Sequence, residues 1–127
     1  AVSARAAAPD AAVKRRWFNR LADPLSKDTL SEQRAAMKGL FPREQDALRA
    51  SFSRDFFAAL ETLAASKDDE FLSAFTESLA PNVCSQESLD SFDAFLAKNP
   101  SLPSVVLKSL RVARHEDSLC LAARAKK

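Results

Sequence analysis

The residue types that most often carry out catalysis or bind metals are scarce in this sequence. His115 is its one histidine, and Cys84 and Cys120 are its two cysteines. A structural zinc site needs a tetrahedral set of such ligands in closely spaced pairs, which this sequence does not contain. His115 and Cys120 would point about 140° apart on one helix, too far for a cysteine–histidine nucleophile. We therefore expect no catalytic, cofactor-binding or metal-binding residue, and no cofactor, in this chain.

Acidic residues offer no clearer site. Asp68, Asp69 and Glu70 stand together where a helix is expected to begin, and acids there interact favourably with the helix dipole. We interpret them as capping residues rather than as a carboxylate pair. Glu116 and Asp117 are neighbours in sequence, so they splay apart on a helix. The single glycine excludes a glycine-rich phosphate-binding loop.

A row of basic residues is the remaining candidate for chemistry. Lys108, Arg111 and His115 recur on one face of the expected last helix, with Arg114 beside them. Such a row is most often a solvated helix face. The functional alternative is a cationic surface that meets a carboxylate, because arginine binds carboxylates in a bidentate geometry. Lys108, Arg111 and Arg114 are therefore the candidate contacts for a carboxylate.

Composition predicts an all-α protein. The 127 residues fit a single helical domain, 1–127, and contain one glycine and no tyrosine but nine phenylalanines. The abundant alanine, leucine and charged residues favour helices over strands.

The charge balance excludes some partners. Nineteen lysines and arginines oppose 17 acids, so the net charge is only +2, and we expect no nucleic-acid partner. No apolar run reaches the roughly 20 residues of a membrane-spanning helix, so membrane insertion is not expected.

Hydrophobic periodicity, together with residues that begin or end helices, predicts about six helices in antiparallel pairs. The opening ten residues read as the end of a helix or as a linker. Ser85 is expected to cap the fifth helix, and Ser101 the sixth. The expected ranges are 9–21, 26 or 29 to 38, 43–64, 68–79, 86–98 and 103–124.

The only glycine lies close to a proline in the stretch GLFP, which predicts a tight corner between two helices. Gly39 is expected to end the second helix in a left-handed conformation, and Pro42 to lie in the first turn of the third. Phe41, between them, is expected to be buried in the corner.

Two parts of the chain resemble each other. Ser26 and Ser85, Leu30 and Leu89, and Met37 and Leu96 are each 59 residues apart. The repeat predicts a segment of an α-solenoid, a superhelix of the HEAT or armadillo kind, in which helical hairpins bury each other's faces.

Hairpin geometry places the two cysteines near each other. If the fifth and sixth helices form an antiparallel hairpin, Cys84 lies about one turn from Cys120. A disulfide is one outcome and would favour an exported or periplasmic protein; two buried free thiols, typical of the cytoplasm, are the other.

Three stretches resemble the C-terminal helical domain of zinc aminopeptidases of the aminopeptidase N family. They are AAM followed by LFP, Gln45 and Leu48; LAPNVCSQES at 79–88; and LRVARHED at 110–117 ahead of Cys120. At the position of His115, similar proteins often have glutamine, which argues against a required role for this histidine.

The resemblance implies a noncatalytic segment of a larger peptidase. In that family the zinc site and the peptide-binding motif lie in the catalytic domain, and neither occurs here. The C-terminal domain is a helical superhelix that encloses the active-site chamber. The implied partners are the parent's own catalytic domain and, indirectly, its peptide substrates, for which Lys108, Arg111 and Arg114 are candidate chamber contacts. The alternatives are a freestanding α-solenoid interaction module and a small catalytic domain.

Overall fold

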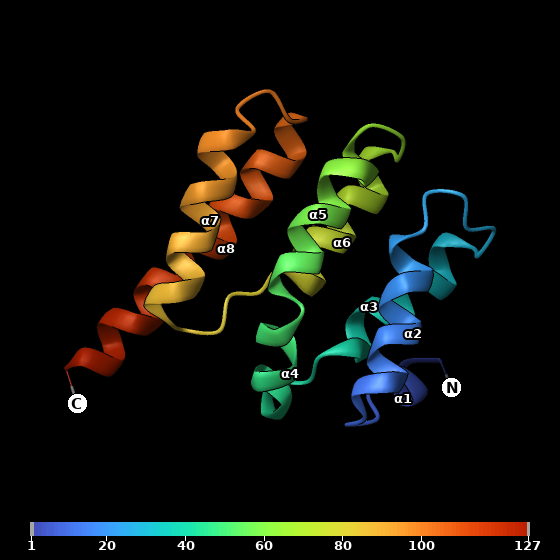
Figure 1. Ribbon diagram of the computed structural model, residues 1–127, viewed down its shortest axis with the longest axis horizontal. Coiled ribbons are helices and arrows are strands. Elements are labelled where there is room, and N and C mark those ends of the chain that lie inside the picture. Colours follow the sequence, from blue (N-terminus) through green and yellow to red (C-terminus); the bar gives the residue numbers. More distant parts are fainter. Residues whose placement is uncertain (1, 127) are drawn as a thin grey trace.

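The computed structural model describes residues 2–126, which form eight α-helices and one short 3-10 helix with no strand (Figure 1). The all-α class is confirmed, whereas the expected count of about six helices is too low. The helices are α1 (Val2–Ala6), α2 (Ala11–Ala22), α3 (Leu30–Leu40), η1 (Arg43–Gln45), α4 (Asp46–Ser51), α5 (Ser53–Ala64), α6 (Asp69–Leu79), α7 (Gln86–Lys98) and α8 (Ser104–Ala125).

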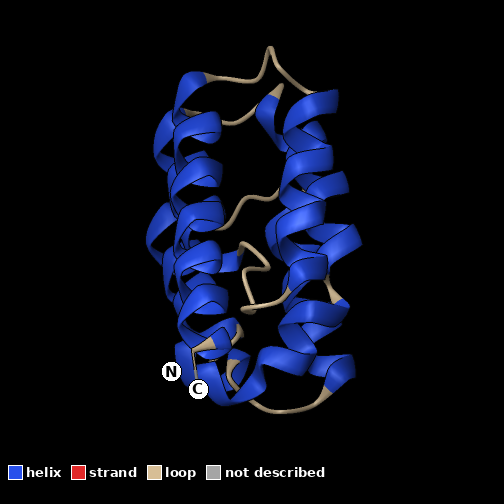
Figure 2. Ribbon diagram, turned by 90° about the vertical axis from the view of Figure 1, so that its left-hand side faces the viewer, coloured by secondary structure: helices blue, strands red, loops and turns tan. Residues whose placement is uncertain are grey.

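The longer helices form three hairpins that stand in a row. Figure 1 shows α2 beside α3, α5 beside α6, and α7 beside α8. Helix α6 packs against both α3 and α8, so these three helices make one layer. Helices α2, α5 and α7 make the other, and the two layers are seen edge-on in Figure 2. The short α1 packs across α3 at one end of the row.

Side-chain caps begin most of the longer helices. Asp10, Thr29, Asp68 and Ser85 each accept a hydrogen bond from a backbone N–H in the first turn. The predicted caps at Asp68 and Ser85 are confirmed. The predicted cap at Ser101 is wrong, because α8 begins directly after Pro103 and has no side-chain cap.

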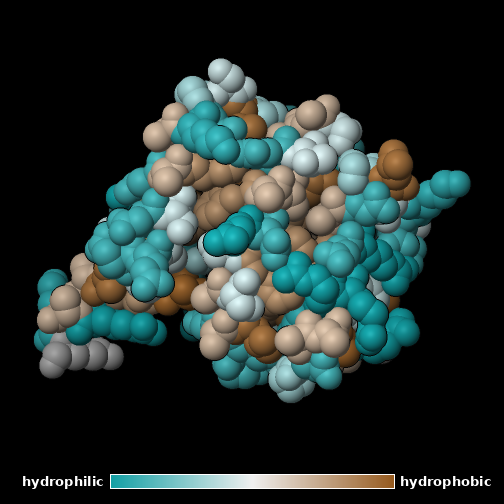
Figure 3. Space-filling view, viewed as in Figure 1, coloured by the Kyte–Doolittle hydropathy of each residue, from teal (hydrophilic) through white to brown (hydrophobic). Residues whose placement is uncertain are grey.

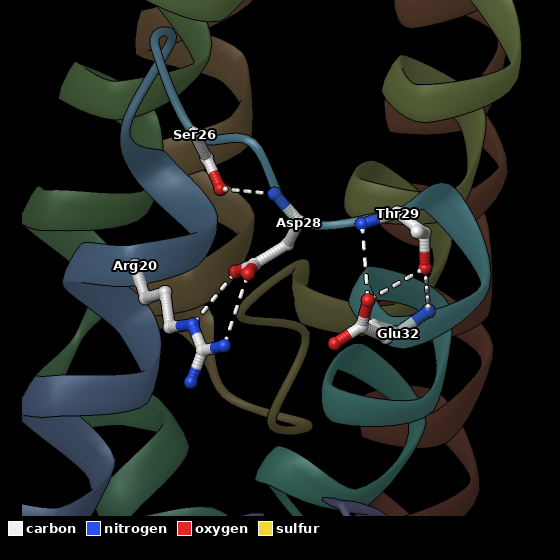
Figure 4. A network of polar contacts seen from close by, with 5 residues as sticks. All are labelled: Arg20, Ser26, Asp28, Thr29 and Glu32. Carbon is white, nitrogen blue, oxygen red and sulfur yellow. Dashed lines mark hydrogen bonds and ion pairs between the residues drawn. The ribbon is translucent and has the colours of Figure 1, made fainter.

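A polar network fixes the connection between α2 and α3 (Figure 4). Arg20 donates two hydrogen bonds to the carboxylate of Asp28, at 2.6 and 2.9 Å, and this contact lowers the pKa of Asp28. Ser26 accepts from the Asp28 backbone N–H, while Thr29 and Glu32 form a capping box. The network lies on the surface and holds the loop rather than a ligand.

Phenylalanine rings connect the hairpins through the core. Phe52 lies 5.3 Å from both Phe18 and Phe41, measured between ring centroids. Phe56 stacks on Phe75 across the α5–α6 hairpin at 5.4 Å. The ring of Phe57 lies against α7. All nine phenylalanines belong to the hydrophobic core or pack against it.

The expected long helix over 43–64 is wrong, because this stretch is divided into η1, α4 and α5. The last break is at Phe52, whose backbone leaves the helical conformation (φ −96°, ψ 6°). Its side chain is 4% exposed and sits between Phe18 and Phe41. The bend brings this ring into the core while α4 follows a different direction from α5 (Figure 1).

Gly39 does not take the left-handed conformation expected of it. It lies inside α3, and no glycine in the part of the chain that the structure describes has a positive φ. A side chain at this position would overlap the backbone carbonyl of Ser3 in α1. The glycine is therefore explained by the close approach of two helices, while the corner is made by Phe41 and Pro42.

Replacing Gly39 with alanine is expected to destabilise the protein by about 1 to 2 kcal/mol. Overpacking costs about 1 to 3 kcal/mol, and the better helix propensity of alanine returns up to about 1 kcal/mol. Thermal unfolding measures the difference. Ser31→Ala, at an exposed position of the same helix, is the matched control and should not lower stability. A Gly39→Ala variant as stable as the control would contradict the close approach of α1.

Candidate functional site

The structure separates the basic residues that the sequence placed together. Arg114 donates two hydrogen bonds to Asp93 of α7, at 2.5 and 3.1 Å, and its guanidinium lowers the pKa of that carboxyl. Lys108 lines a groove between α6 and α8. Arg111 is exposed on α8, and His115 is also exposed. Of the three candidates, Lys108 is the one that lies in a groove.

The groove between α6 and α8 has a volume of about 470 Å³. Its apolar wall consists of Val105, Val112 and Ala113 of α8, and Val112 is 51% exposed. Serine, asparagine and charged side chains form its polar parts: Ser73, Glu77, Asn82, Lys108, Ser109 and Glu116. An open groove with apolar and polar walls is suited to binding a peptide-like or small polar ligand.

A second groove, of about 530 Å³, continues along α8 toward α4. The two grooves share Glu77, Asn82 and Glu116. The second groove is more polar and carries three arginines, Arg43, Arg49 and Arg124, with Asp46 and Asp117 among its acids. Together the grooves form one surface along most of α8, which we call the α8 groove.

The other layer contains a separate hollow. A groove of about 840 Å³ lies between α5 and α7, with Phe57, Ala58, Ala94 and Phe95 among its lining residues. Figure 3 shows this face, with tan and brown surface between the two helices. Of its charged lining residues, all but Arg54 form ion pairs, Glu61 with Lys98 and Asp55 with Arg15. This hollow therefore presents less free charge than the α8 groove.

A disulfide joins Cys84 to Cys120 at the edge of the α8 groove, with 5.5 Å between their Cα atoms. This is the pairing that the hairpin geometry predicted as one of two outcomes. Cys84 is the one non-glycine residue with a positive φ (61°) within residues 2–126. Its backbone N–H donates to Asp117 at 2.5 Å, and the Ser88 hydroxyl donates to the other carboxylate oxygen.

Asp117 is a structural residue that sequence reasoning missed. It is 2% exposed, while its neighbour Glu116 faces the groove. The expected splay of the two acids is therefore observed, but with one of them buried. A buried carboxylate needs hydrogen-bond donors, and Cys84 and Ser88 supply them.

Arg49 is the second missed residue. Its guanidinium donates to the carbonyls of Ser78, in the last turn of α6, and Ala80, directly after α6, at 3.1 and 2.9 Å. It also donates to the carbonyl of Phe41 at 2.8 Å. Burial lowers the pKa of Arg49. The side chain thus connects the corner after α3 to the loop after α6, and no local sequence pattern indicates such a long-range contact.

Lys14 is the third missed residue, and its side chain is fully buried. Its ammonium group donates to the carbonyl of Ala6 at 2.7 Å and to the carbonyl of Leu40. Both carbonyls lie in the last turns of helices, where the dipole favours a cation.

Lys14 is expected to make stability rise with pH in alkaline solution. Desolvation lowers its pKa below the ordinary 10.5. Between the folded pKa and 10.5 the unfolded chain binds more protons, so raising the pH there favours the folded state. Urea unfolding across this range measures the slope. Lys14→Met should reduce the slope, and an identical slope in the variant would contradict an ionisable Lys14 in the core.

The described residues provide no metal centre. No group of three histidine, cysteine or acidic side chains within residues 2–126 is arranged to hold a metal ion. Over the same residues, no helix has both the length and the apolar character needed to cross a bilayer.

Comparison with known families identifies the chain. Residues 1–115 match the family model of the ERAP1-like C-terminal domain. No match was found among curated proteins or among solved structures. The match covers most of the 127 residues and agrees with the resemblance to aminopeptidases of the aminopeptidase N family. The chain therefore belongs to the ERAP1-like C-terminal domain family.

Proposed function

We propose that the chain is the noncatalytic C-terminal helical part of an aminopeptidase N-type zinc metallopeptidase. It packs on the catalytic half of that enzyme and shapes the access of peptides to the active-site chamber. The observation that carries the proposal is the family match over residues 1–115. In this proposal the zinc ion is held by the catalytic domain of the parent, and this chain supplies no ligand to it.

The architecture supports an α-solenoid role. Three hairpins in two layers are the arrangement that a superhelix of the HEAT or armadillo kind would have, and such folds present extended surfaces to a partner. The α8 groove presents exposed apolar and charged side chains, so we place the peptide-facing side there. Lys108 is the chamber contact that we retain from the three basic candidates. The Cys84–Cys120 disulfide favours an exported or periplasmic parent.

A zinc measurement and a peptidase assay on the 127-residue chain test the noncatalytic role. We expect no stoichiometric zinc and no release of N-terminal amino acids, whereas the gene upstream of Ala1 should encode a zinc peptidase domain. Stoichiometric zinc with turnover in this chain alone would overturn the proposal. An upstream sequence without a peptidase domain would favour the alternative, a freestanding α-solenoid that binds a protein through the exposed Val112 and Leu119.

The access role is tested in the whole enzyme. Removing the disulfide with Cys84→Ala and Cys120→Ala loosens the edge of the α8 groove. We expect hydrolysis of long peptides to change more than hydrolysis of an aminoacyl amide, which does not reach the helical domain. Equal effects on both substrates would contradict a role in peptide access.

A further inference from the structure

We infer that the α6–α8 part of the α8 groove selects peptides by charge, taking an extended segment with an acidic group and a basic side chain on either side of an apolar residue. This inference rests on the proposed function and adds the chemistry of the peptide.

The basic and acidic side chains of this groove lie at different positions along α8. Lys108 lies toward one end, and Glu77 and Glu116 lie where the α6–α8 part meets the second groove. None of these three side chains has an ion-pair partner among the residues that the structure describes. Glu77 accepts a hydrogen bond from the Ser73 hydroxyl at 3.1 Å, which leaves its negative charge unneutralised. The charges of these three side chains can therefore attract a ligand, unlike that of Arg114, which is paired with Asp93.

The spacing fits an extended peptide. Lys108 and Glu116 are eight residues apart on one helix, a rise of about 12 Å. An extended chain covers that distance in about four residues. The exposed side chain of Val112 lies between the two charges on α8 and is available to an apolar side chain of the peptide.

The two acids come from different walls of the groove. Glu77 belongs to α6 and Glu116 to α8, so a lysine or arginine entering between them meets a carboxylate on each side. The second groove adds Arg43, Arg49 and Arg124, with Asp46 and Asp117. Arg49 is bonded to backbone carbonyls and Asp117 to Cys84 and Ser88, so these two are already occupied.

Binding of synthetic peptides to the 127-residue chain tests the inference. The probe is a fluorescein-labelled, amidated nonapeptide with a central leucine, an aspartate two residues before it and a lysine two residues after it. A second peptide replaces the lysine with glutamine. We expect the first peptide to bind about three- to fivefold more tightly, the upper end of the range for one exposed charge pair, and the difference to shrink at high salt.

Protein variants then test whether the peptide binds in this groove. Glu116→Gln should reduce the preference for the lysine peptide, because Glu77 alone then faces the lysine, whereas Glu87→Gln, an exposed acid on α7 outside the groove, should leave it unchanged. Both variants replace surface residues, and circular dichroism checks that they fold. An unchanged preference in Glu116→Gln, or equal binding of the two peptides, overturns the inference. The proposed access role fails separately, when the disulfide variants of the whole enzyme treat long and short substrates alike.

Discussion

Replacing Phe41 with alanine is expected to lower the free energy of unfolding by about 3 to 5 kcal/mol, the usual cost of truncating a buried phenylalanine. The ring is 4% exposed and lies 5.3 Å from the ring of Phe52. The guanidinium of Arg49 and the ammonium of Lys14 lie near its face, at 5.4 and 5.7 Å from the centroid. The substitution therefore leaves a cavity where α3, α4 and the core meet.

Urea or thermal unfolding measures this loss. Phe41→Leu keeps most of the buried volume and should cost clearly less than Phe41→Ala. Val112→Ala removes an apolar side chain that is 51% exposed, and should change stability little. A Phe41→Ala variant that unfolds at the wild-type temperature would show that the corner is open to solvent.

Features set by local sequence were predictable. The caps at Asp68 and Ser85 depend on a side chain and a backbone N–H within one helical turn, so the residue types are enough to indicate them. The hairpin of α7 and α8 follows from two adjacent helices with a short connection. This hairpin was enough to predict that Cys84 and Cys120 lie close together.

Features set by distant contacts were not predictable. Gly39 was expected to end a helix, because nothing near it in sequence indicates that α1 crosses α3 there. The division of 43–64 depends on where the core accepts the Phe52 ring. Lys14 and Arg49 look like surface charges until the carbonyls that they bind are placed by other helices.

The candidate site likewise combines a feature that the local sequence indicates with contacts that it does not. The helical period shows which residues of α8 share a face, and it identified Lys108 in this way. The period does not say which neighbour each face meets, so the ion pair of Arg114 with Asp93 on α7 was missed. Glu77 lines the groove from α6, and no pattern within α6 indicates that this residue faces α8.

Removing the disulfide is expected to cost about 4 kcal/mol. The bond closes a loop between residues 36 positions apart, and the loop-entropy estimate for that length gives this value. The double variant Cys84→Ala, Cys120→Ala should therefore unfold at much lower denaturant concentration. Thiol titration of the denatured, unreduced wild type should find no reactive thiol, because no free cysteine accompanies the bridge. Two reactive thiols would contradict the bond itself.

A second double variant separates the cross-link from the backbone conformation of Cys84. Residue 84 has a φ of 61°, which costs an alanine roughly 1 kcal/mol and a glycine almost nothing. Cys84→Gly with Cys120→Ala should therefore be about 1 kcal/mol more stable than the alanine pair, although it lacks the same bond. The backbone N–H of residue 84 can still donate to Asp117 in both variants. If the glycine variant is no more stable than the alanine variant, the loop changes conformation once the bond is absent, and Asp117 alone does not hold it.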